Sequence, residues 1–509
     1  MKNIIYIALF TFSTVVFGQL NPQTKNITQK FFDEVEKLDK ITPRLQKENG
    51  FTSYLELHSF LNGLVKNHPS KVTKSFIGKT QDGKIIPMVV LTNPNIKQKI
   101  KVFMQGGLHG DEPASTEGML YLIKKLLDDE NYNKILDDIE LAVIPMANID
   151  GYLKQNRYAK NGLDLNRDQT KIMAPETIVL KNAFVNFNPH VAIDFHEYRP
   201  YRRDYAMMGD FGVAGRYDVM FLYSSNLNVP KNLRDFTENI LVENARKKLS
   251  SYNIAHHPYF SSADDSGEVH INQGSLNSRS SATNFALTNT ISTLVEVRGV
   301  GLGKTSYSRR VFSTFITAIS FLQTAASNKE KIKEEIQKAN QQQNEVVVTH
   351  KRTPYRDKIE FIDLDDEELI TLDVIKKDAS KANADLVRKR PVAYYLDESQ
   401  STLVNKLKTL GVEVHQLKND TEKLAETYTI SYYDKDYKKY EKMEQQDVET
   451  TVAQEKVNFK TGTYVVDMNQ KRANIVIELL EPEAPNSFVS FGVLPTKKGH
   501  KLPIYRILK

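Results

Sequence analysis

Short apolar runs alternate with amphipathic stretches through the middle of the chain. The runs at residues 101–107, 141–145, 191–195 and 292–299 have the pattern of buried strands. Apolar residues at three- and four-residue spacing predict helices at 118–129 and 308–326. This alternation predicts an α/β fold with a mixed, mostly parallel twisted sheet and helices on both faces.

The flanking regions have other patterns. Helical spacing of apolar residues predicts helices at 31–38 and 54–69, and Asp82-Gly83 between two apolar runs predicts a hairpin. Residues 329–343 are polar all round and are interpreted as a solvated helical linker. A β–α–β-like stretch then begins at residue 390, which indicates a smaller α/β domain.

A chain of 509 residues is too long for one ordinary core, so several units are expected. The predicted division is a signal peptide (1–18), a helical lead-in packed on the next domain (19–75), a catalytic domain (76–327), the linker (328–345) and a C-terminal domain of unassigned role (346–509). Lys2 followed by an apolar stretch favours a signal peptide cleaved near Gly18-Gln19. The sequence thus predicts a secreted or periplasmic protein without a stable membrane anchor.

Composition narrows the function classes. Hydrophobic residues make up 40% and charged residues 26% of the chain, as in globular proteins. The 69 basic and 63 acidic residues give a net charge of +6 without a basic block, so a nucleic-acid partner is not expected. The chain has no Cys and hence no disulfides, and an exported protein of this kind depends on its core. The oligomeric state is not predicted.

The strand ends carry residues suited to a metal site. His109 and Glu112 follow the first strand as an H-x-x-E pair, and a spacing of three residues on one turn lets both reach one cation. His196 follows the third strand and is the natural third ligand. Catalytic zinc sites commonly use two His and one Glu plus water. In open α/β sheets, ligands bind beyond the carboxyl ends of strands, where these residues are expected.

Other polar residues near the strand ends suit hydrolysis. Glu296 ends the fourth strand, and burial there would raise its pKa toward that of a useful base; a pair with Arg298 is the alternative. Arg157 and the Asn166-Arg167 pair offer positive charge for an oxyanion or a substrate carboxylate. Asp164 could accept the second ring N–H of a ligand histidine. Taken singly, each charged residue could equally form a surface salt bridge.

Together these residues resemble the M14 family of zinc metallocarboxypeptidases. The family's pattern is H-x-x-E, N-x-D-G-[FY], an Arg nine residues before N-R within D-x-N-R, a third His and a late Glu. Here it corresponds to His109 with Glu112, residues 148–152, Arg157 with Asn166-Arg167, His196 and Glu296. The resemblance covers roughly residues 51–326 and implies the zinc carboxypeptidase fold.

The resemblance implies a role for each residue. One Zn²⁺ per chain is held by His109, Glu112 and His196, and Asp164 supports His109. Glu296 is the general base and later proton donor, while Arg157 polarises the scissile carbonyl. Asn166 and Arg167 bind the terminal carboxylate of a peptide or protein substrate. The implied reaction is zinc-dependent hydrolysis of C-terminal peptide bonds.

The chain departs from the family in one respect. A Tyr that caps the substrate carboxylate in many members is absent from residues 272–290, and Tyr259 lies farther upstream than the family's spacing. Arg279 and Arg298 are further candidates for binding the carboxylate. Two alternatives therefore stay open. One is a zinc amidase or peptidase acting on cell-wall muropeptides, and the other is a catalytically silent peptide-binding homologue.

Overall fold

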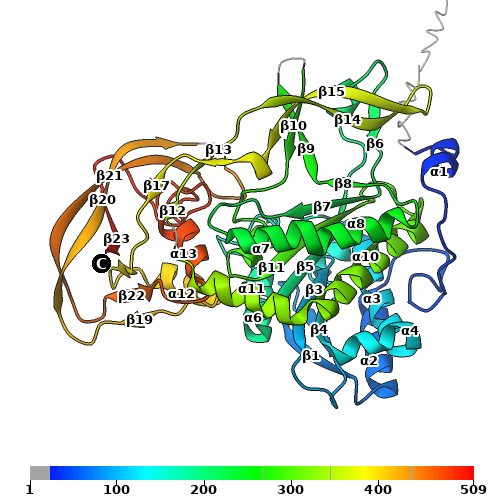
Figure 1. Ribbon diagram of the computed structural model, residues 1–509, viewed down its shortest axis with the longest axis horizontal. Helices are drawn as coiled ribbons and strands as arrows, with labels where there is room; N and C mark the ends of the chain where they lie inside the picture. The colour runs from blue at the N-terminus through cyan, green and yellow to red at the C-terminus, as the bar shows by residue number, and fades with distance from the viewer. Residues whose placement is uncertain (1–22, 266–267, 344, 437–438, 509) are drawn as a thin grey trace, which may run out of the picture.

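A computed structural model describes residues 23–265, 268–343, 345–436 and 439–508 (Figure 1). The predicted signal peptide at 1–18 lies outside the described residues. The central strands and the helices packed on them occupy one part of the molecule, and the strands β18–β23 lie at one end of its long axis (Figure 1).

An eight-stranded mixed sheet forms the centre, in the order β1-β2-β4-β3-β5-β11-β7-β8. Its strands are β1 (Val72–Lys79), β2 (Ile85–Leu91), β3 (Ile100–Gly106), β4 (Ile139–Ile144), β5 (Val191–Tyr198), β7 (Val219–Tyr223), β8 (His256–Pro258) and β11 (Ile291–Arg298). The four inner strands β4, β3, β5 and β11 are parallel. They coincide with the four predicted runs, so the predicted fold class is confirmed, and β1 with β2 forms the predicted hairpin.

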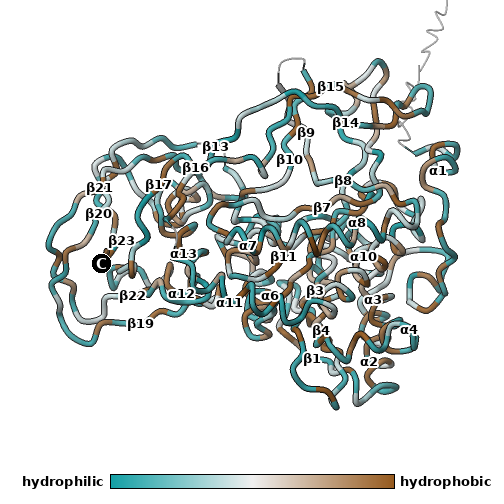
Figure 2. Tube along the Cα trace, in the orientation of Figure 1, coloured by the Kyte–Doolittle hydropathy of each residue, from teal (hydrophilic) through white to brown (hydrophobic). Residues whose placement is uncertain are grey.

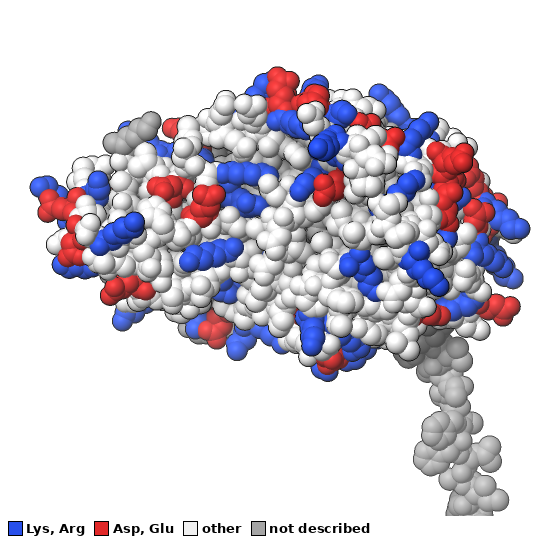
Figure 3. All heavy atoms as spheres, turned by 90° about the horizontal axis from the view of Figure 1, so that it is seen from below, with Lys and Arg blue, Asp and Glu red and all other residues white. Residues whose placement is uncertain are grey.

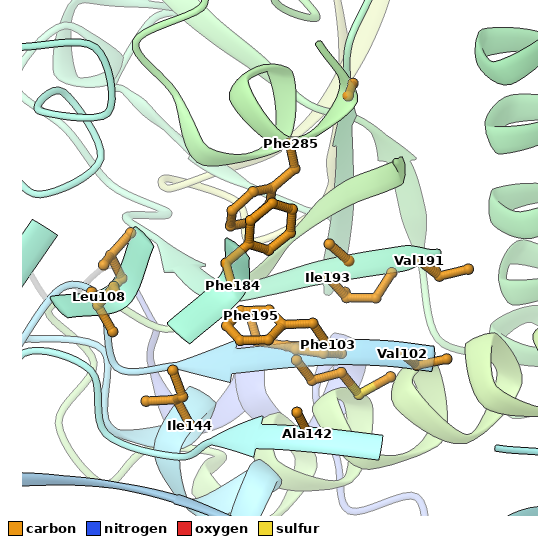
Figure 4. Close-up of a cluster of buried hydrophobic side chains, with 14 of the residues drawn as sticks. Val102, Phe103, Leu108, Ala142, Ile144, Phe184, Val191, Ile193, Phe195 and Phe285 are labelled. Carbon is orange, nitrogen blue, oxygen red and sulfur yellow. The ribbon is translucent and has the colours of Figure 1, made fainter. Parts of the chain in front are cut away.

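Helices cover both faces of this sheet. They include α2 (Tyr54–Asn67), α3 (Pro113–Asp128), α6 (Pro175–Phe187), α9 (Ser281–Ala286) and α10 (Tyr307–Ser327). On one face, Phe103 of β3 lies 5.6 Å from Phe184 of α6 and 6.1 Å from Phe285 of α9, between ring centroids (Figure 4). On the other face, a Cβ at Gly106 would lie 2.7 Å from the Ser115 carbonyl oxygen of α3. Glycine here lets α3 approach the strand closely.

The predicted helix at 31–38 is wrong. Helix α1 (Lys25–Phe31) ends where that helix was expected to begin, and residues 33–52 are irregular. Phe32 is buried with Ala214 and Ile362, and the Arg298 guanidinium lies 4.0 Å from its ring centroid. Apolar residues spaced like a helix here pack an irregular segment against Ala214, Arg298 and Ile362 from distant parts of the chain, so tertiary contacts override local propensity.

The linker helix is not polar all round. Helix α11 (Lys329–Gln341) buries Ile332, Ile336 and Ala339 in the same core cluster as the central sheet. These residues are spaced by four and three positions, so they share one face. The helix is therefore packed on the core of the central sheet, and the interpretation as a solvated linker is corrected.

A second sheet crosses the predicted boundary at residue 346. Its order is β6-β14-β15-β10-β9, with β6 (Val213–Gly215), β9 (Phe260–Asp265), β10 (Glu268–Gln273), β14 (Tyr355–Asp363) and β15 (Leu369–Asp378). Strand β14 pairs with β6, and β15 pairs with β10. Residues on both sides of the boundary thus complete one sheet. Two-residue pairs follow, β12 (Val346–Val347) with β17 (Val387–Arg388) and β13 (His350–Lys351) with β16 (Asn383–Ala384).

The rest of the chain forms a six-stranded sheet in the order β19-β22-β18-β23-β20-β21. The strands of this sheet are β18 (Ala393–Leu396), β19 (His415–Gln416), β20 (Thr421–Lys435), β21 (Gln446–Phe459), β22 (Tyr464–Asp467) and β23 (Lys501–Ile507). Two helices, α12 (Ser401–Thr409) and α13 (Ala473–Leu480), lie between these strands in the chain. Strands β20 and β21, at one end of this order, are more hydrophilic than the inner strands of the eight-stranded sheet (Figure 2). Helix α13 is wholly buried, and its Glu478 accepts hydrogen bonds of 2.8 Å from the side-chain amides of Asn226 and Asn228.

One buried ion pair ties the central strands to two helices. Glu197 of β5 accepts a 2.7 Å bond from Arg310 Nε of α10 and a 2.9 Å bond from the Ala114 amide of α3. A Cβ at Gly299 would lie 1.8 Å from Glu197 Oε1, so only glycine leaves room for the pair. Removing one partner of a buried pair leaves an uncompensated charge, which is strongly destabilising.

We expect Glu197→Gln to lower the free energy of unfolding by about 3–5 kcal/mol, because Arg310 stays buried without its counter-ion. Urea denaturation followed by circular dichroism measures the change. The control is Asp235→Asn at the exposed Lys231–Asp235 pair, where the expected loss is under ~1 kcal/mol. Equal effects of the two substitutions would contradict a structural role for the Glu197 pair.

Candidate active site

The register of the parallel strands brings the candidate residues to one edge. Glu296 of β11 is the cross-strand partner of His196 in β5, and Gly106 at the end of β3 is the partner of Phe195. His109 and Glu112 follow directly in the turn between β3 and α3. Carboxyl ends of parallel strands therefore deliver these side chains to one place, as in other open α/β sheets.

Three buried side chains converge as a metal-binding group. The donor atoms of His109, Glu112 and His196 all lie within 4.8 Å of one another. Glu112 Oε1 lies 2.6 Å from His109 Nδ1, and Oε2 lies 2.8 Å from His196 Nδ1. The two Nδ1 atoms are 3.1 Å apart, so both rings present the same nitrogen to one point. Two imidazoles and a carboxylate suit Zn²⁺.

Two carboxylates orient the histidine rings. Asp164 accepts a 3.0 Å hydrogen bond from Nε2 of His109, and Asp194 accepts one of 2.9 Å from Nε2 of His196. Such bonds fix the ring tautomer and raise the basicity of the other nitrogen. Burial alone would raise the pKa of Asp164, but His109 and Arg157 hold it well below its ordinary value.

The sequence analysis found Asp164 but missed Asp194. A usable signal was present, because Asp194 precedes His196 by two residues on a strand. Residues two apart on a strand point to the same face. The spacing of Asp194 from His196 therefore indicates that its carboxylate can bond to the His196 ring.

Glu296 faces the same point from the neighbouring strand. Its side chain lines a cavity of about 620 Å³ together with His109 and Arg157. Burial raises the pKa of Glu296 to about 7, and the Glu112 carboxylate also raises it. The alternative pair with Arg298 is not found among the described residues.

Arg298 is corrected as a candidate for carboxylate binding. Its side chain is buried, donates a 2.8 Å bond from Nε to the Gly215 carbonyl, and is bonded to Gln23 through Nη1. It is not among the residues that line the cavity. The other candidates, Arg157, Asn166, Arg167 and Arg279, all line it. Arg157 is held in place by Asp164, whose Oδ2 accepts bonds of 2.9 and 2.7 Å from Nε and Nη2.

Tyr259 lies in the cavity despite its distance along the sequence. It follows β8, and its amide bonds to the Phe221 carbonyl of β7, the neighbour of β11. It lines the cavity with Glu296, and burial raises its pKa to about 12. The position of Tyr259 along the sequence suggested that it lies too far from Glu296. The pairing of β7 with β8 and with β11 brings the two residues to the same cavity.

A loop from the C-terminal region also reaches the site, which the sequence did not indicate. It joins β20 to β21. Glu441 Oε2 accepts a 2.9 Å bond from the Asp164 amide, and Lys442 Nζ bonds to the Asn161 carbonyl. The Arg279 guanidinium lies 4.8 Å from the Tyr440 ring centroid. The C-terminal region thus contacts the backbone of Asp164, whose carboxylate orients a candidate ligand, and an arginine of the cavity.

Comparisons with known proteins agree with this geometry. Residues 57–206 match the family model of the zinc carboxypeptidases, a range that contains His109, Glu112, Arg157 and His196. Carboxypeptidase 2 of Trichophyton rubrum is 28% identical over 442 residues, which cover 84% of this chain and 81% of that protein. Zinc carboxypeptidase A 1 of Drosophila melanogaster is 30% identical over 134 residues, or 25% of this chain and 31% of the relative.

Among solved structures, carboxypeptidase A from Helicoverpa armigera is similar with a TM-score of 0.42 and 19% identity, over 60% of this chain and 79% of that one. The assignment of this domain rests on the matched sequence model, together with the buried His–Glu–His group. The chain is therefore a metallopeptidase with an M14-type zinc carboxypeptidase domain over residues 57–206, and zinc is its cofactor.

Proposed function

We propose that the protein removes C-terminal residues from peptides by zinc-dependent hydrolysis, with Glu296 as general base. The observation that carries the proposal is the convergence of His109, Glu112 and His196 beside Glu296 in a cavity lined with arginines. Neither alternative from the sequence analysis, the muropeptide amidase or the silent homologue, is favoured by the comparisons.

The donor set fits zinc. His109 and His196 would bind it through Nδ1, and Glu112 through its carboxylate, because Asp164 and Asp194 already engage the two Nε2 atoms. When bound, zinc supplies a Lewis acid that polarises a carbonyl and lowers the pKa of water. The buried aspartates keep both rings aimed at this point before a metal arrives.

Glu296 performs the proton transfers in this proposal. Its carboxylate takes a proton from the attacking water and then delivers it to the leaving amine. A base is most effective when its pKa lies near the working pH, and burial raises that of Glu296 to about 7. Its place opposite His196 in the strand register holds it beside the metal-binding group.

Cationic side chains bind and polarise the substrate. Arg157, fixed by Asp164, stabilises the negative charge that develops on the scissile carbonyl oxygen. Asn166 and Arg167 bind the terminal carboxylate, which restricts cleavage to the last peptide bond. Arg279 and Tyr259 line the same cavity and take over the role of the capping Tyr that is absent from residues 272–290.

We also propose that the protein acts outside the cytoplasm. The proposal rests on the sequence at residues 1–18 and on the predicted cleavage near Gly18-Gln19. Within the described part of the chain, none of the helices has the length and apolar character needed to cross a bilayer.

Purified residues 19–509 incubated with a mixed peptide pool test the proposed function. We expect loss of single C-terminal residues, read by mass spectrometry, and we expect a zinc chelator to stop it. Zinc added back after removal of the chelator should restore the activity. Internal cleavage, or cleavage that persists without metal, would contradict the proposal.

Glu296→Gln is expected to lower kcat by about 10²–10⁴-fold, because the amide cannot accept the proton. Zinc content, measured by mass spectrometry of the metal, should stay the same. An active variant would remove Glu296 from the role of base, and loss of zinc would mean that the substitution disturbs the metal site instead.

Asp194→Ala is expected to weaken zinc binding by about 10–100-fold, because the His196 ring loses the acceptor that orients it. Competition with a metal-binding dye measures the affinity. Asp235→Asn, at an exposed ion pair, serves as control and should leave the affinity unchanged. An unaltered affinity in Asp194→Ala would show that the carboxylate is not needed to hold the ring.

A further inference from the structure

The cavity holds far more positive than negative charge. Six of its lining residues are arginines: Arg157, Arg167, Arg199, Arg202, Arg279 and Arg352. The acidic residues that line it are Glu197 and Glu296. This imbalance is local, because the chain as a whole has 69 basic and 63 acidic residues, and charges of both signs are interspersed on the face shown in Figure 3.

Only part of this charge is neutralised within the protein. Arg157 pairs with Asp164 at 2.7 Å, and Arg202 pairs with Asp204 at 3.1 Å. The Glu197 carboxylate is already bound by Arg310 at 2.6 Å, so it does not compensate a cavity arginine.

Four cavity arginines remain without a carboxylate partner among the described residues, namely Arg167, Arg199, Arg279 and Arg352. Arg279 packs on Tyr440, and Arg352 makes a bond of 3.5 Å to the Lys377 carbonyl. Arg167 bonds to the carbonyl of Asn166. Carboxylates at longer range, Asp164 and Glu441 near Arg279 and Asp378 near Arg352, offset these charges only in part.

The arginines come from separate parts of the fold. Arg167 lies in the loop before α6, Arg199 and Arg202 follow β5, Arg279 precedes α9, and Arg352 follows β13. Burial lowers the pKa of Arg279, and the nearby Arg167 guanidinium adds to this effect. Arg167, Arg279 and Arg352 are only partly exposed, so water screens their charges incompletely. Mutual repulsion in a partly closed cavity is relieved by an anionic ligand.

We propose that the preferred substrates are acidic peptides, which carry one or more side-chain carboxylates at or next to the C-terminus. The inference rests on the proposed carboxypeptidase function and adds its substrate class. A single terminal carboxylate engages Arg167 with Asn166 and leaves the other guanidinium groups unpaired. Additional carboxylates neutralise them through charge-assisted, bidentate hydrogen bonds, for which the arginine fork is well suited.

Matched peptides test this substrate class. One set carries Glu, Gln or Lys as the last residue, and a second set carries the same three residues in the penultimate position. Glu and Gln have the same shape, so their ratio of kcat/KM reports charge alone. We expect the kcat/KM of the Glu peptide to exceed that of the Gln peptide by about tenfold or more in one set, since hydrogen bonds to a charged group are roughly twice as strong as neutral ones. The Lys peptide should be poorest.

Salt provides an independent readout. Raising the ionic strength from about 0.05 to 0.5 M shortens the screening length and should reduce the Glu-to-Gln ratio. Equal rates for Glu and Gln peptides in both sets, or a preference for Lys, would overturn the acidic-substrate inference while leaving the carboxypeptidase function standing. Failure to cleave any peptide would instead reject the proposed function itself.

Substitution of single arginines locates the preference. Arg352→Gln should lower the Glu-to-Gln ratio several-fold, and Arg199→Gln should lower it less, because Arg199 is exposed to solvent. Arg356→Gln is the matched control, because Arg356 lies four residues after Arg352 but is 77% exposed and pairs with Glu268 outside the cavity. It should keep the ratio. A ratio unchanged in both Arg199→Gln and Arg352→Gln would remove these residues from substrate recognition.

Discussion

Removal of charged groups from water is the constraint on which this site depends. Glu112 and His196 are 1% and 0% exposed, so each charge or ring nitrogen must find its partner inside the protein. The resulting network is continuous. Arg157 binds Asp164, Asp164 binds His109, and on the other side Asp194 binds His196. The three side chains suited to a metal, the carboxylates that orient the rings and the guanidinium proposed to polarise a substrate therefore share one set of hydrogen bonds.

The same constraint links the site to its scaffold. Glu197 follows His196 in β5 and points its carboxylate to Arg310 and to the amide of Ala114. The strand that supplies a candidate ligand is thereby fastened to α10 and to the first turn of α3. Because α3 begins directly after Glu112, this ion pair also fixes the direction in which the metal-binding turn leaves the sheet.

Much of the fold could be predicted because its signals are local. Apolar runs marked β3, β4, β5 and β11, and the residues after them fell at one sheet edge because parallel strands align their carboxyl ends. The motif residues His109, Glu112 and His196 were found for this reason. The segment 31–38 and helix α11 were misjudged, since their apolar residues are used in contacts with distant parts of the chain.

What the sequence could not reveal depends on pairing between remote segments. The five-stranded sheet joins β6, β9 and β10 to strands that follow residue 346, so no local change of composition marks a boundary there. Glu441 reaches Asp164 and Tyr440 reaches Arg279 only because β20 and β21 extend back toward the catalytic sheet. Strand pairing also brought Tyr259 to the cavity against its sequence spacing.

The contact of the β20–β21 loop with the catalytic region has a consequence for the order of events during biosynthesis. The residues of the metal-binding group leave the ribosome early, whereas Tyr440 and Glu441 follow much later. Until they are made, the Asp164 amide lacks its acceptor and Arg279 lacks its aromatic partner. A nascent chain therefore carries an unfinished substrate cavity while its own later segments are still unfolded.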